Sequence, residues 1–258
     1  MQPIFTGQYG VRSTMSTRPS RALARVLSKL GVASRTTAAQ WIHAGRVAVD
    51  DTVITDPDFT VSAQARITLD GRALTAAAKL YYMLNKPRGL VTTTHDEHER
   101  ATVYECLPAE LRRQLAPVGR LDKASEGLLL LSNDTQWSAA ILEPTRQLPK
   151  LYHVQINCLP DAPLLQTLQH GLTCDGEHLD IAAIRELRRG DKNAWLEITL
   201  TAGKNRHIRR MLAACGVEVL RLIRVAIGPL QLGQLPKGQC RILEPSELQQ
   251  LALWRPGK

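Results

Sequence analysis

The chain has 258 residues and a formal net charge of +9, because 33 Lys and Arg residues outnumber 24 Asp and Glu residues, and this balance favours a polyanionic partner, above all nucleic acid. At this length the chain forms one large domain or two smaller ones, and its 44% hydrophobic content excludes global disorder. No run of about 18 apolar residues occurs, which excludes a membrane-spanning helix, and no apolar signal-peptide core is found.

The first 19 residues show no hydrophobic periodicity and are interpreted as a flexible leader. No acidic residue precedes Asp50, whereas seven Lys or Arg residues do. An acid-free start of this kind resembles an organelle transit peptide. The basic residues continue into a patterned region, however, which favours contacts with RNA. Met15 is an alternative start of the protein.

Residues 20–75 have the pattern of a small α/β domain. Apolar residues recur at helical spacing through residues 23–30, and Gly31 ends this helix. Ser34 is placed to cap a second helix, which Gly45 closes. Short strands are expected next, at residues 47–49, 53–54 and 65–69.

Basic residues of this domain fall mostly off its apolar stripes, where they can reach RNA phosphates. The residues predicted to do so are Arg21, Arg25, Lys29, Arg35 and Arg46. The alternative is an ordinary solvated helix face, and the absence of acidic residues through Arg46 favours a basic one. The element order and the phrase ASRTTAAQWIHAGRVAVD resemble the alpha-L RNA-binding module of the S-four ribosomal protein type.

A short linker, AAAK at 76–79, precedes a larger domain at 80–245, and residues 246–258 are expected to form a C-terminal tail. The larger domain opens with YYMLNKPRGLVTT, a strand that enters a basic loop. Period-two alternation predicts strands from Leu151 and from Trp195. The apolar run GLLLLSND predicts a strand buried on both faces. Many strands with few helices indicate an α+β domain around a largely antiparallel, mixed sheet.

One carboxylate, Asp122, lies between Arg120 and Lys123 in the stretch GRLDKASEGLLLLSND, just before the buried strand. A carboxylate serves as a general base or as a nucleophile, and a nearby cation keeps it ionised by lowering its pKa. The alternative is a surface ion pair in a loop.

A basic helix is expected within AGKNRHIRRMLAACG, residues 202–216. At about 100° per residue, Arg206 and Arg210 point away from the apolar stripe and can meet phosphate, whereas Arg209 flanks it and can pair with a carboxylate. The alternative is a helix with generic surface arginines. The apolar stripe consists of Ile208, Met211, Leu212 and Cys215.

Other chemistries have little support in the sequence. Its five cysteines are scattered and form no C-x-x-C motif, which argues for a reducing compartment and against a zinc ribbon or a disulfide framework. His95 and His98 are interpreted as residues of a solvated loop rather than metal ligands. No glycine-rich nucleotide-binding motif occurs, so neither a metal nor a cofactor is predicted.

Taken in order, the blocks KPRG, GRLD-K-x-S-E-G-L-L-L-L-S-N-D, K-x-Y-H-V-Q-I, G-K-N-R-H-I-R-R-M and L-R-L-I-R-V-A-I-G resemble the pseudouridine synthase family, and within it the ribosomal RNA group of the RsuA and RluB types. The resemblance extends from Arg21 to about Pro245. It implies that Asp122 is the catalytic aspartate, that Tyr152 stacks on the target base and that Arg209 forms a salt bridge with the aspartate.

The resemblance also implies that Leu222 lies in the wall of the pocket. His207 departs from the family pattern, which has glutamine there, so its role stays open. So does the choice of whether the aspartate attacks the sugar, attacks the base or removes a proton. Residues expected to contact RNA in this domain are Lys86, Arg88, Arg120, Arg206 and Arg210.

The implied function is isomerisation of uridine to pseudouridine in ribosomal RNA, with the large subunit favoured over the small one and without a cofactor. The expected protein is a cytoplasmic monomer that acts on pre-ribosomal particles or free RNA. One alternative is a non-catalytic RNA-binding or ribosome-assembly protein on the same fold. Another is a glycosidase, which needs two carboxylates and for which Glu126 is the nearest second one.

Overall fold

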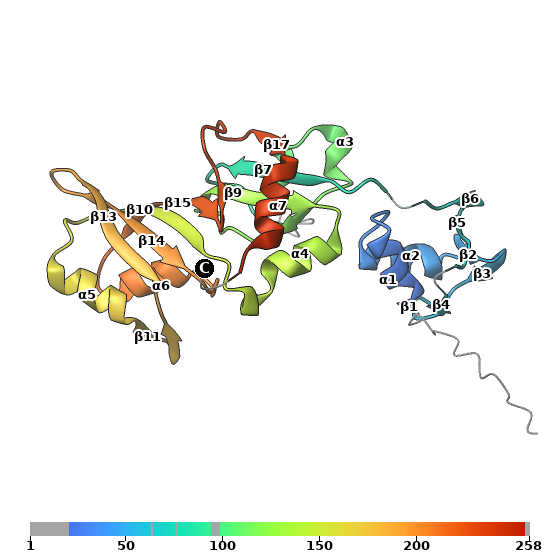
Figure 1. Cartoon of the computed structure of the whole chain (residues 1–258), viewed down its shortest axis with the longest axis horizontal. Helices are drawn as coiled ribbons and strands as arrows, with labels where there is room; N and C mark the ends of the chain where they lie inside the picture. Colours follow the sequence, from blue (N-terminus) through green and yellow to red (C-terminus); the bar gives the residue numbers. More distant parts are fainter. Residues whose placement is uncertain (1–20, 63, 76, 94–98, 256–258) are drawn as a thin grey trace, which may run out of the picture. The chain divides into compact units, whose positions relative to one another are not determined.

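The computed structural model describes residues 21–62, 64–75, 77–93 and 99–255 (Figure 1). The predicted leader with Met15, and the pair His95 and His98, lie outside these residues. The chain divides into two compact units, Met1–Ala77 and Ala78–Lys258. This division falls within the segment predicted as a linker.

The smaller unit packs two helices against short strands around its own core. Ser34 caps the second helix as predicted, because its side chain accepts a hydrogen bond from the N–H of Thr37 at 3.0 Å. The pairing of β1 with β4 was not predicted, since two-residue strands are too short to show alternation. The helices are α1 (Leu23–Lys29) and α2 (Arg35–His43). The strands are β1 (Arg21–Ala22), β2 (Val47–Val49), β3 (Thr52–Ile54), β4 (Thr60–Val61), β5 (Ile67–Leu69) and β6 (Arg72–Ala73).

The larger unit is built on one sheet with the strand order β13-β14-β10-β15-β9-β7-β17, to which β16 and β8 add at β15 and β9. Its pairs are antiparallel except for β9 with β15, which confirms the predicted α+β class with a mixed, largely antiparallel sheet. The strands are β7 (Tyr81–Lys86), β8 (Ala116–Val118), β9 (Glu126–Ser132), β10 (Lys150–Ile156), β11 (Leu172–Cys174), β12 (Glu177–Leu179), β13 (Ala183–Arg189), β14 (Ala194–Leu200), β15 (Val219–Ile227), β16 (Leu230–Gln231) and β17 (Cys240–Ile242).

Two groups of helices pack against this sheet (Figure 1). Side chains of α5 and α6 join a core with β10, β14 and β15 that also includes Leu84 of β7 and Leu129 and Leu131 of β9. Side chains of α4 and α7 join a second core with other residues of β7 and β9. None of the helices in the described ranges is long and apolar enough to cross a membrane. The helical segments are η1 (Val103–Cys106), α3 (Ala109–Arg112), α4 (Thr135–Leu142), η2 (Pro144–Arg146), α5 (Ala162–His170), α6 (His207–Ala214) and α7 (Pro245–Leu253).

The parallel contact between β9 and β15 is short and close. It consists of two paired positions, Glu126 with Ile223 and Gly127 with Arg224. Gly127 has a φ of +100°, and a Cβ atom there would lie 2.2 Å from the carbonyl oxygen of Arg224. Only glycine therefore allows the two strands to approach this closely.

Two segments differ from their expected form. Most of the predicted C-terminal tail belongs to α7, whose Leu251 is fully buried, and the indole N–H of Trp254 donates to the carbonyl of Arg146 at 3.3 Å. The basic helix begins at His207 rather than near residue 202. Arg206 precedes it in the left-handed conformation, with a φ of +47°, which interrupts the helical pattern read from the sequence.

Candidate active site

Asp122 lies in the turn between β8 and β9, where its backbone is held by several hydrogen bonds. Its carbonyl accepts the N–H of Ser125 at 2.9 Å and the Nζ of Lys86 at 3.2 Å. The next carbonyl, that of Lys123, accepts the N–H of Gly89 at 2.8 Å. The KPRG loop and the GRLD turn are separate in the sequence, but these hydrogen bonds connect them beside the half-buried carboxylate of Asp122.

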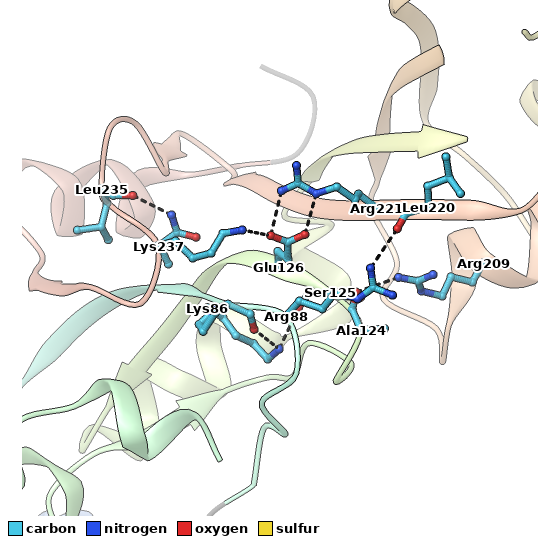
Figure 2. Close-up of polar contacts among 12 residues, drawn as sticks. Lys86, Arg88, Ala124, Ser125, Glu126, Arg209, Leu220, Arg221, Leu235 and Lys237 are labelled. Carbon is cyan, nitrogen blue, oxygen red and sulfur yellow. Dashed lines mark hydrogen bonds and ion pairs between the residues drawn. The ribbon is translucent and has the colours of Figure 1, made fainter. Parts of the chain in front are cut away.

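Lys86 was predicted to contact RNA, and this prediction is wrong. The residue is fully buried at the end of β7, and its Nζ donates to the carbonyls of Pro87, Asp122 and Ser125 at 3.0, 3.2 and 2.9 Å. Figure 2 shows Lys86 beside Ser125. Burial lowers the pKa of Lys86 to about 8, against the opposing effect of nearby acidic groups. Lys86 therefore holds the turn that carries Asp122 from inside the unit.

Arg209 lies on the first turn of α6 and is directed at the same turn. Its guanidinium donates to the carbonyl of Ala124 at 3.1 Å (Figure 2) and to that of Val219 at 3.3 Å. Its buried Nε finds no partner among the residues that the structure describes. Burial and the charges of Arg206 and Arg88 lower the pKa of Arg209, whereas the charge of Asp122 raises it.

A direct salt bridge between Arg209 and Asp122 was expected, but no such pair occurs among the residues that the structure describes. The guanidinium instead binds the backbone two residues beyond the carboxylate. Arg209 is close enough to act on Asp122 through its charge, and it fixes the turn through hydrogen bonds. The flanking helical phase predicted from the sequence is correct, because Arg209 is half-buried beside the apolar stripe.

Three further cations differ in their availability to a ligand. Arg88, Arg120 and Arg206, which were predicted to contact RNA, are exposed. Arg88 makes only a long hydrogen bond, 3.5 Å, to the carbonyl of Leu220. Arg88 and Arg206 both lie near enough to Arg209 to lower its pKa. Positive charge thus exceeds negative charge around Asp122, which suits a polyanionic ligand.

Arg210 was predicted to meet phosphate, but its side chain is engaged within the protein. It forms ion pairs with Glu177 at 2.6 Å and Asp175 at 3.4 Å, and it donates to the carbonyl of Cys174 at 2.7 Å. These contacts connect α6 with the β11–β12 hairpin. The helical phase correctly directed Arg210 away from the apolar stripe, but a hairpin rather than solvent lies there.

Tyr152 and Leu222 lie on the neighbouring strands β10 and β15. Tyr152, on β10, pairs with Arg224 of β15, and Val154 pairs with Leu222, so both predicted pocket residues lie on one face of the sheet. Both belong to the core cluster that also contains Ile208 of α6. The ring is 9% exposed, so it is held rigidly rather than displayed on the surface.

His207, which replaces the family glutamine, is buried at the start of α6. Its ring lies close to the backbone of Asp180 in the interior of the unit. Burial lowers the pKa of His207, which favours the neutral imidazole. The structure thus assigns this side chain to the interior of the unit.

Glu126 is the carboxylate whose role sequence reasoning missed. Both of its oxygens bind Arg221, at 3.0 Å each, and one also binds Lys237 at 2.5 Å (Figure 2). Burial raises the pKa of Glu126, but the hydrogen bonds and charges of the two cations lower it by more. The pKa of Glu126 therefore lies below its usual value. A carboxylate that stays ionised is unsuited to the general-acid role in a glycosidase, which removes the support for that alternative. No local signal identifies this pair, because its members lie 95 residues apart.

In the smaller unit, four of the cations predicted to form a basic face lie on β1, on α1 and at the start of α2. Partial desolvation and the charges of Arg21, Arg25 and Arg35 lower the pKa of Lys29, so these four cations lie close together. Arg46 differs from them, because it binds both oxygens of Asp70, at 3.0 and 2.5 Å, and lies over the ring of Trp41. Asp70 follows 24 residues later in the chain and partly neutralises Arg46.

Comparisons with known proteins agree with this arrangement. The family model for RNA pseudouridylate synthase matches residues 80–214, and the model for the S4 domain matches residues 23–67. An uncharacterized RNA pseudouridine synthase of Aquifex aeolicus is 36% identical over 88% of this chain and 92% of its own length. Ribosomal large subunit pseudouridine synthase B of Bacillus subtilis is 31% identical over 89% of this chain and 94% of its own length.

Among solved structures, a crystal structure of a pseudouridylate synthase is similar in fold, with a TM-score of 0.64 and 28% identity, and the match covers 90% of this chain and 100% of the other. The sequence likeness and the fold likeness therefore extend over both units. The order of motifs read from the sequence is thereby explained, and the chain belongs to the RNA pseudouridine synthase family, with an S4 domain at its N-terminal side.

Proposed function

We propose that this protein converts uridine to pseudouridine in ribosomal RNA, that large-subunit RNA is its preferred substrate, and that Asp122 is the reacting carboxylate. The observation that carries the proposal is the placement of Asp122, in a turn fixed by Lys86 and Arg209 and surrounded by an excess of positive charge. The name of the Bacillus subtilis relative supports the choice of ribosomal RNA and of the large subunit.

The reaction has modest chemical needs. The glycosidic carbon–nitrogen bond breaks, the base rotates, and a new bond forms between the sugar and carbon 5 of the base. Substrate and product are isomers, so no oxidant, reductant or phosphoryl group is consumed, and no cofactor is required. One ionised carboxylate suffices as nucleophile or base.

The protein environment supplies the remaining functions. Arg209, with Arg88 and Arg206 near it, places positive charge close to the carboxylate of Asp122. Tyr152 is a rigid aromatic group suited to hold the base by stacking after the glycosidic bond is cut. The target base must leave any duplex to reach this site, and Arg88, Arg120 and Arg206 are placed to bind the displaced backbone.

The proposal also covers the setting of the reaction. The basic face of the S4 domain would bind ribosomal RNA, either free or in a pre-ribosomal particle, and a single chain would carry both units. All five cysteines are free, which suits the reducing environment of the cytoplasm. A non-catalytic role in ribosome assembly is the competing function, since it needs the same basic face but not Asp122.

Mapping of pseudouridine in ribosomal RNA from cells with and without this protein tests the proposal. We expect loss of the modification at one or a few positions of the large-subunit RNA. Wild-type protein should restore it, and Asp122→Asn should not. An unchanged pseudouridine map, or restoration by Asp122→Asn, would refute the catalytic role and favour the assembly role. Loss confined to small-subunit RNA would refute the substrate preference alone.

A further inference from the structure

The sheet of the larger unit consists of two halves that meet at one short junction. β13, β14, β10 and β15 form one half, and β9, β7 and β17 form the other. Among the described residues, the strands of the two halves are paired only through Glu126 and Gly127 of β9 and two residues of β15. Asp122 lies in the turn before β9, whereas Tyr152 and Leu222 belong to the opposite half. The halves also share a hydrophobic core, so this junction and that core together set the relative placement of the proposed reacting groups.

Arginine side chains from both halves cross the junction. Arg88 donates from the β7 side to the carbonyl of Leu220, and Arg209 donates from α6 to the carbonyl of Ala124 (Figure 2). The Nε of Arg224 donates to the carbonyl of Leu128 at 2.8 Å. These three contacts end on neutral carbonyl groups, and Arg88 makes the longest of them.

The fourth crossing is of a different kind, because it joins two charged groups. Arg221 of β15 binds both carboxylate oxygens of Glu126, whose side chain is 4% exposed (Figure 2). Lys237, from the loop before β17, binds the same carboxylate from the other side. A bidentate arginine–carboxylate pair fixes distance and orientation together, which a single hydrogen bond does not.

The anchored residue is also close to Asp122 along the chain. Glu126 follows it by four positions, and the intervening turn is closed by the hydrogen bond from Ser125 to the carbonyl of Asp122. Any displacement of Glu126 relative to β15 is therefore transmitted to Asp122 through a short, hydrogen-bonded segment. A misplacement of about 1 Å in a reacting group can lower a rate by roughly 100-fold.

We propose that Glu126 and Arg221 are positioning residues, whose bidentate pair across the sheet junction sets the placement of Asp122 relative to Tyr152 and Arg209. Lys237 orients the carboxylate for that pair. This inference rests on the proposed function in one respect, namely that Asp122 is the reacting group. Neither Glu126 nor Arg221 touches the substrate in this role.

The test compares Glu126→Gln with the matched variant Glu247→Gln. Glu247 forms the same type of bidentate pair with Arg241, at 2.7 and 2.6 Å, between β17 and α7, away from the junction. Both variants remove one carboxylate charge from a similar ion pair. We expect Glu126→Gln to lower the single-turnover rate at saturating RNA by roughly 10- to 100-fold, with RNA affinity unchanged. The rate of Glu247→Gln should equal that of the wild type.

Amide hydrogen exchange supplies a readout that needs no activity. Glu126→Gln should speed exchange on both sides of the junction, at residues 122–128 and 219–225, and Glu247→Gln should not. A wild-type protein that forms no pseudouridine would refute the proposed function, and exchange would still report whether the pair holds the junction. The inference is overturned if exchange at the junction is unchanged, or if the two variants lose rate equally.

A variant that fails to fold would not end the test. Arg221→Lys keeps the positive charge but cannot form the bidentate contact. We expect an intermediate loss of rate at saturating RNA from Arg221→Lys, with exchange increased at the same two segments. A wild-type rate for Arg221→Lys together with unchanged exchange would also overturn the inference.

Discussion

The smaller unit gathers cations in an exposed cluster, whereas the larger unit also buries cations around its candidate site. On the smaller unit, Arg21, Arg25 and Arg35 are exposed and gather around Lys29. In the larger unit, several cations point inward or bind neighbouring elements. Lys86 and Arg224 are buried, and the guanidinium of Arg209 donates to the carbonyls of Val219 and Ala124, the second of which Figure 2 shows.

This difference separates binding from site construction. Exposed, clustered cations interact with a polyanion through long-range, salt-sensitive attraction. Buried cations instead satisfy carbonyl groups and hold the turn around Asp122, and salt screens them little. The basic net charge thus includes cations suited to bind a polyanion and cations that support the turn around Asp122. Only the structure shows which cation belongs to which group. The predictions below test this division, from the largest expected effect to the smallest.

Asp122→Asn should abolish the chemistry of the larger unit and spare the binding by the smaller one. We expect the single-turnover rate to fall by roughly 1,000-fold or more, because a catalytic carboxylate acts on the reacting atoms themselves. RNA affinity should stay close to that of the wild type, since Asp122 holds no phosphate. Residual activity above a few per cent would show that another group performs the reaction.

Arg209→Met should lower the maximal rate by roughly 100-fold at any salt concentration, because it removes both the charge near Asp122 and the hydrogen bond to Ala124. Its neighbour provides the control. Arg210→Met should lower thermal stability, through loss of the contacts with Glu177 and Cys174, and leave RNA affinity unchanged. Kinetics at saturating RNA and two ionic strengths measure both effects. A salt-rescued binding defect in Arg210→Met would restore the phosphate role first expected for it.

Deleting residues 1–77 should weaken RNA binding far more than it slows the bound-state step. The remaining unit has its own cores, and the deleted one carries the exposed basic cluster. Each lost phosphate contact should flatten the dependence of log affinity on log salt by roughly 0.7–0.9. Equal salt slopes for the full and truncated proteins would show that the smaller unit does not touch the RNA backbone.

A finer version of this test keeps the chain intact. Replacement of Arg21, Arg25 and Arg35 by Gln should reproduce most of the change in salt slope. Arg66→Gln serves as the control, because Arg66 belongs to the same unit but is paired with Asp51. A change in slope from Arg66→Gln as large as that from the triple variant would place the RNA on another face.

Lys86→Met should change stability in a pH-dependent way and lower the rate at saturating RNA by less than about tenfold, because other hydrogen bonds still hold Asp122. The pKa of Lys86 is about 8 in the folded protein, below the ordinary value of 10.5. Between these values the unfolded chain binds more protons, so the stability that Lys86 contributes rises with pH.

Denaturant unfolding of both proteins at pH 7.5 and pH 10 measures this difference. Relative to Lys86→Met, the wild type should gain up to about 3 kcal/mol over this interval. Effects common to both proteins, such as tyrosine ionisation, cancel in the comparison. A constant difference in stability would show that the buried amine keeps its ordinary pKa.

Local patterns were enough to predict much of the fold. The alternation in β10 and β14, the apolar run of β9 and the cap at Ser34 are all confirmed. Each of these features depends on residues that are close together in the sequence. The strands follow from their periodicity or from burial on both faces, and the cap follows from a hydrogen bond between Ser34 and the residue three positions later. The helical phase of Arg209 and Arg210 was correct for the same reason. The placement of Asp122 in a turn before a buried strand also follows from the order of residues alone.

The partners of the charged side chains were decided by tertiary structure. Sequence order could not show that a hairpin covers Arg210, that Lys86 turns inward, or that Glu126 meets Arg221 across the sheet. A cation has the same charge and reach whether solvent, a carbonyl or a carboxylate lies beside it, and distant segments determine which of these it meets. The sequence by itself therefore determined the family, the sheet and the candidate carboxylate, while packing determined which cations lie within the candidate site and which remain exposed to solvent.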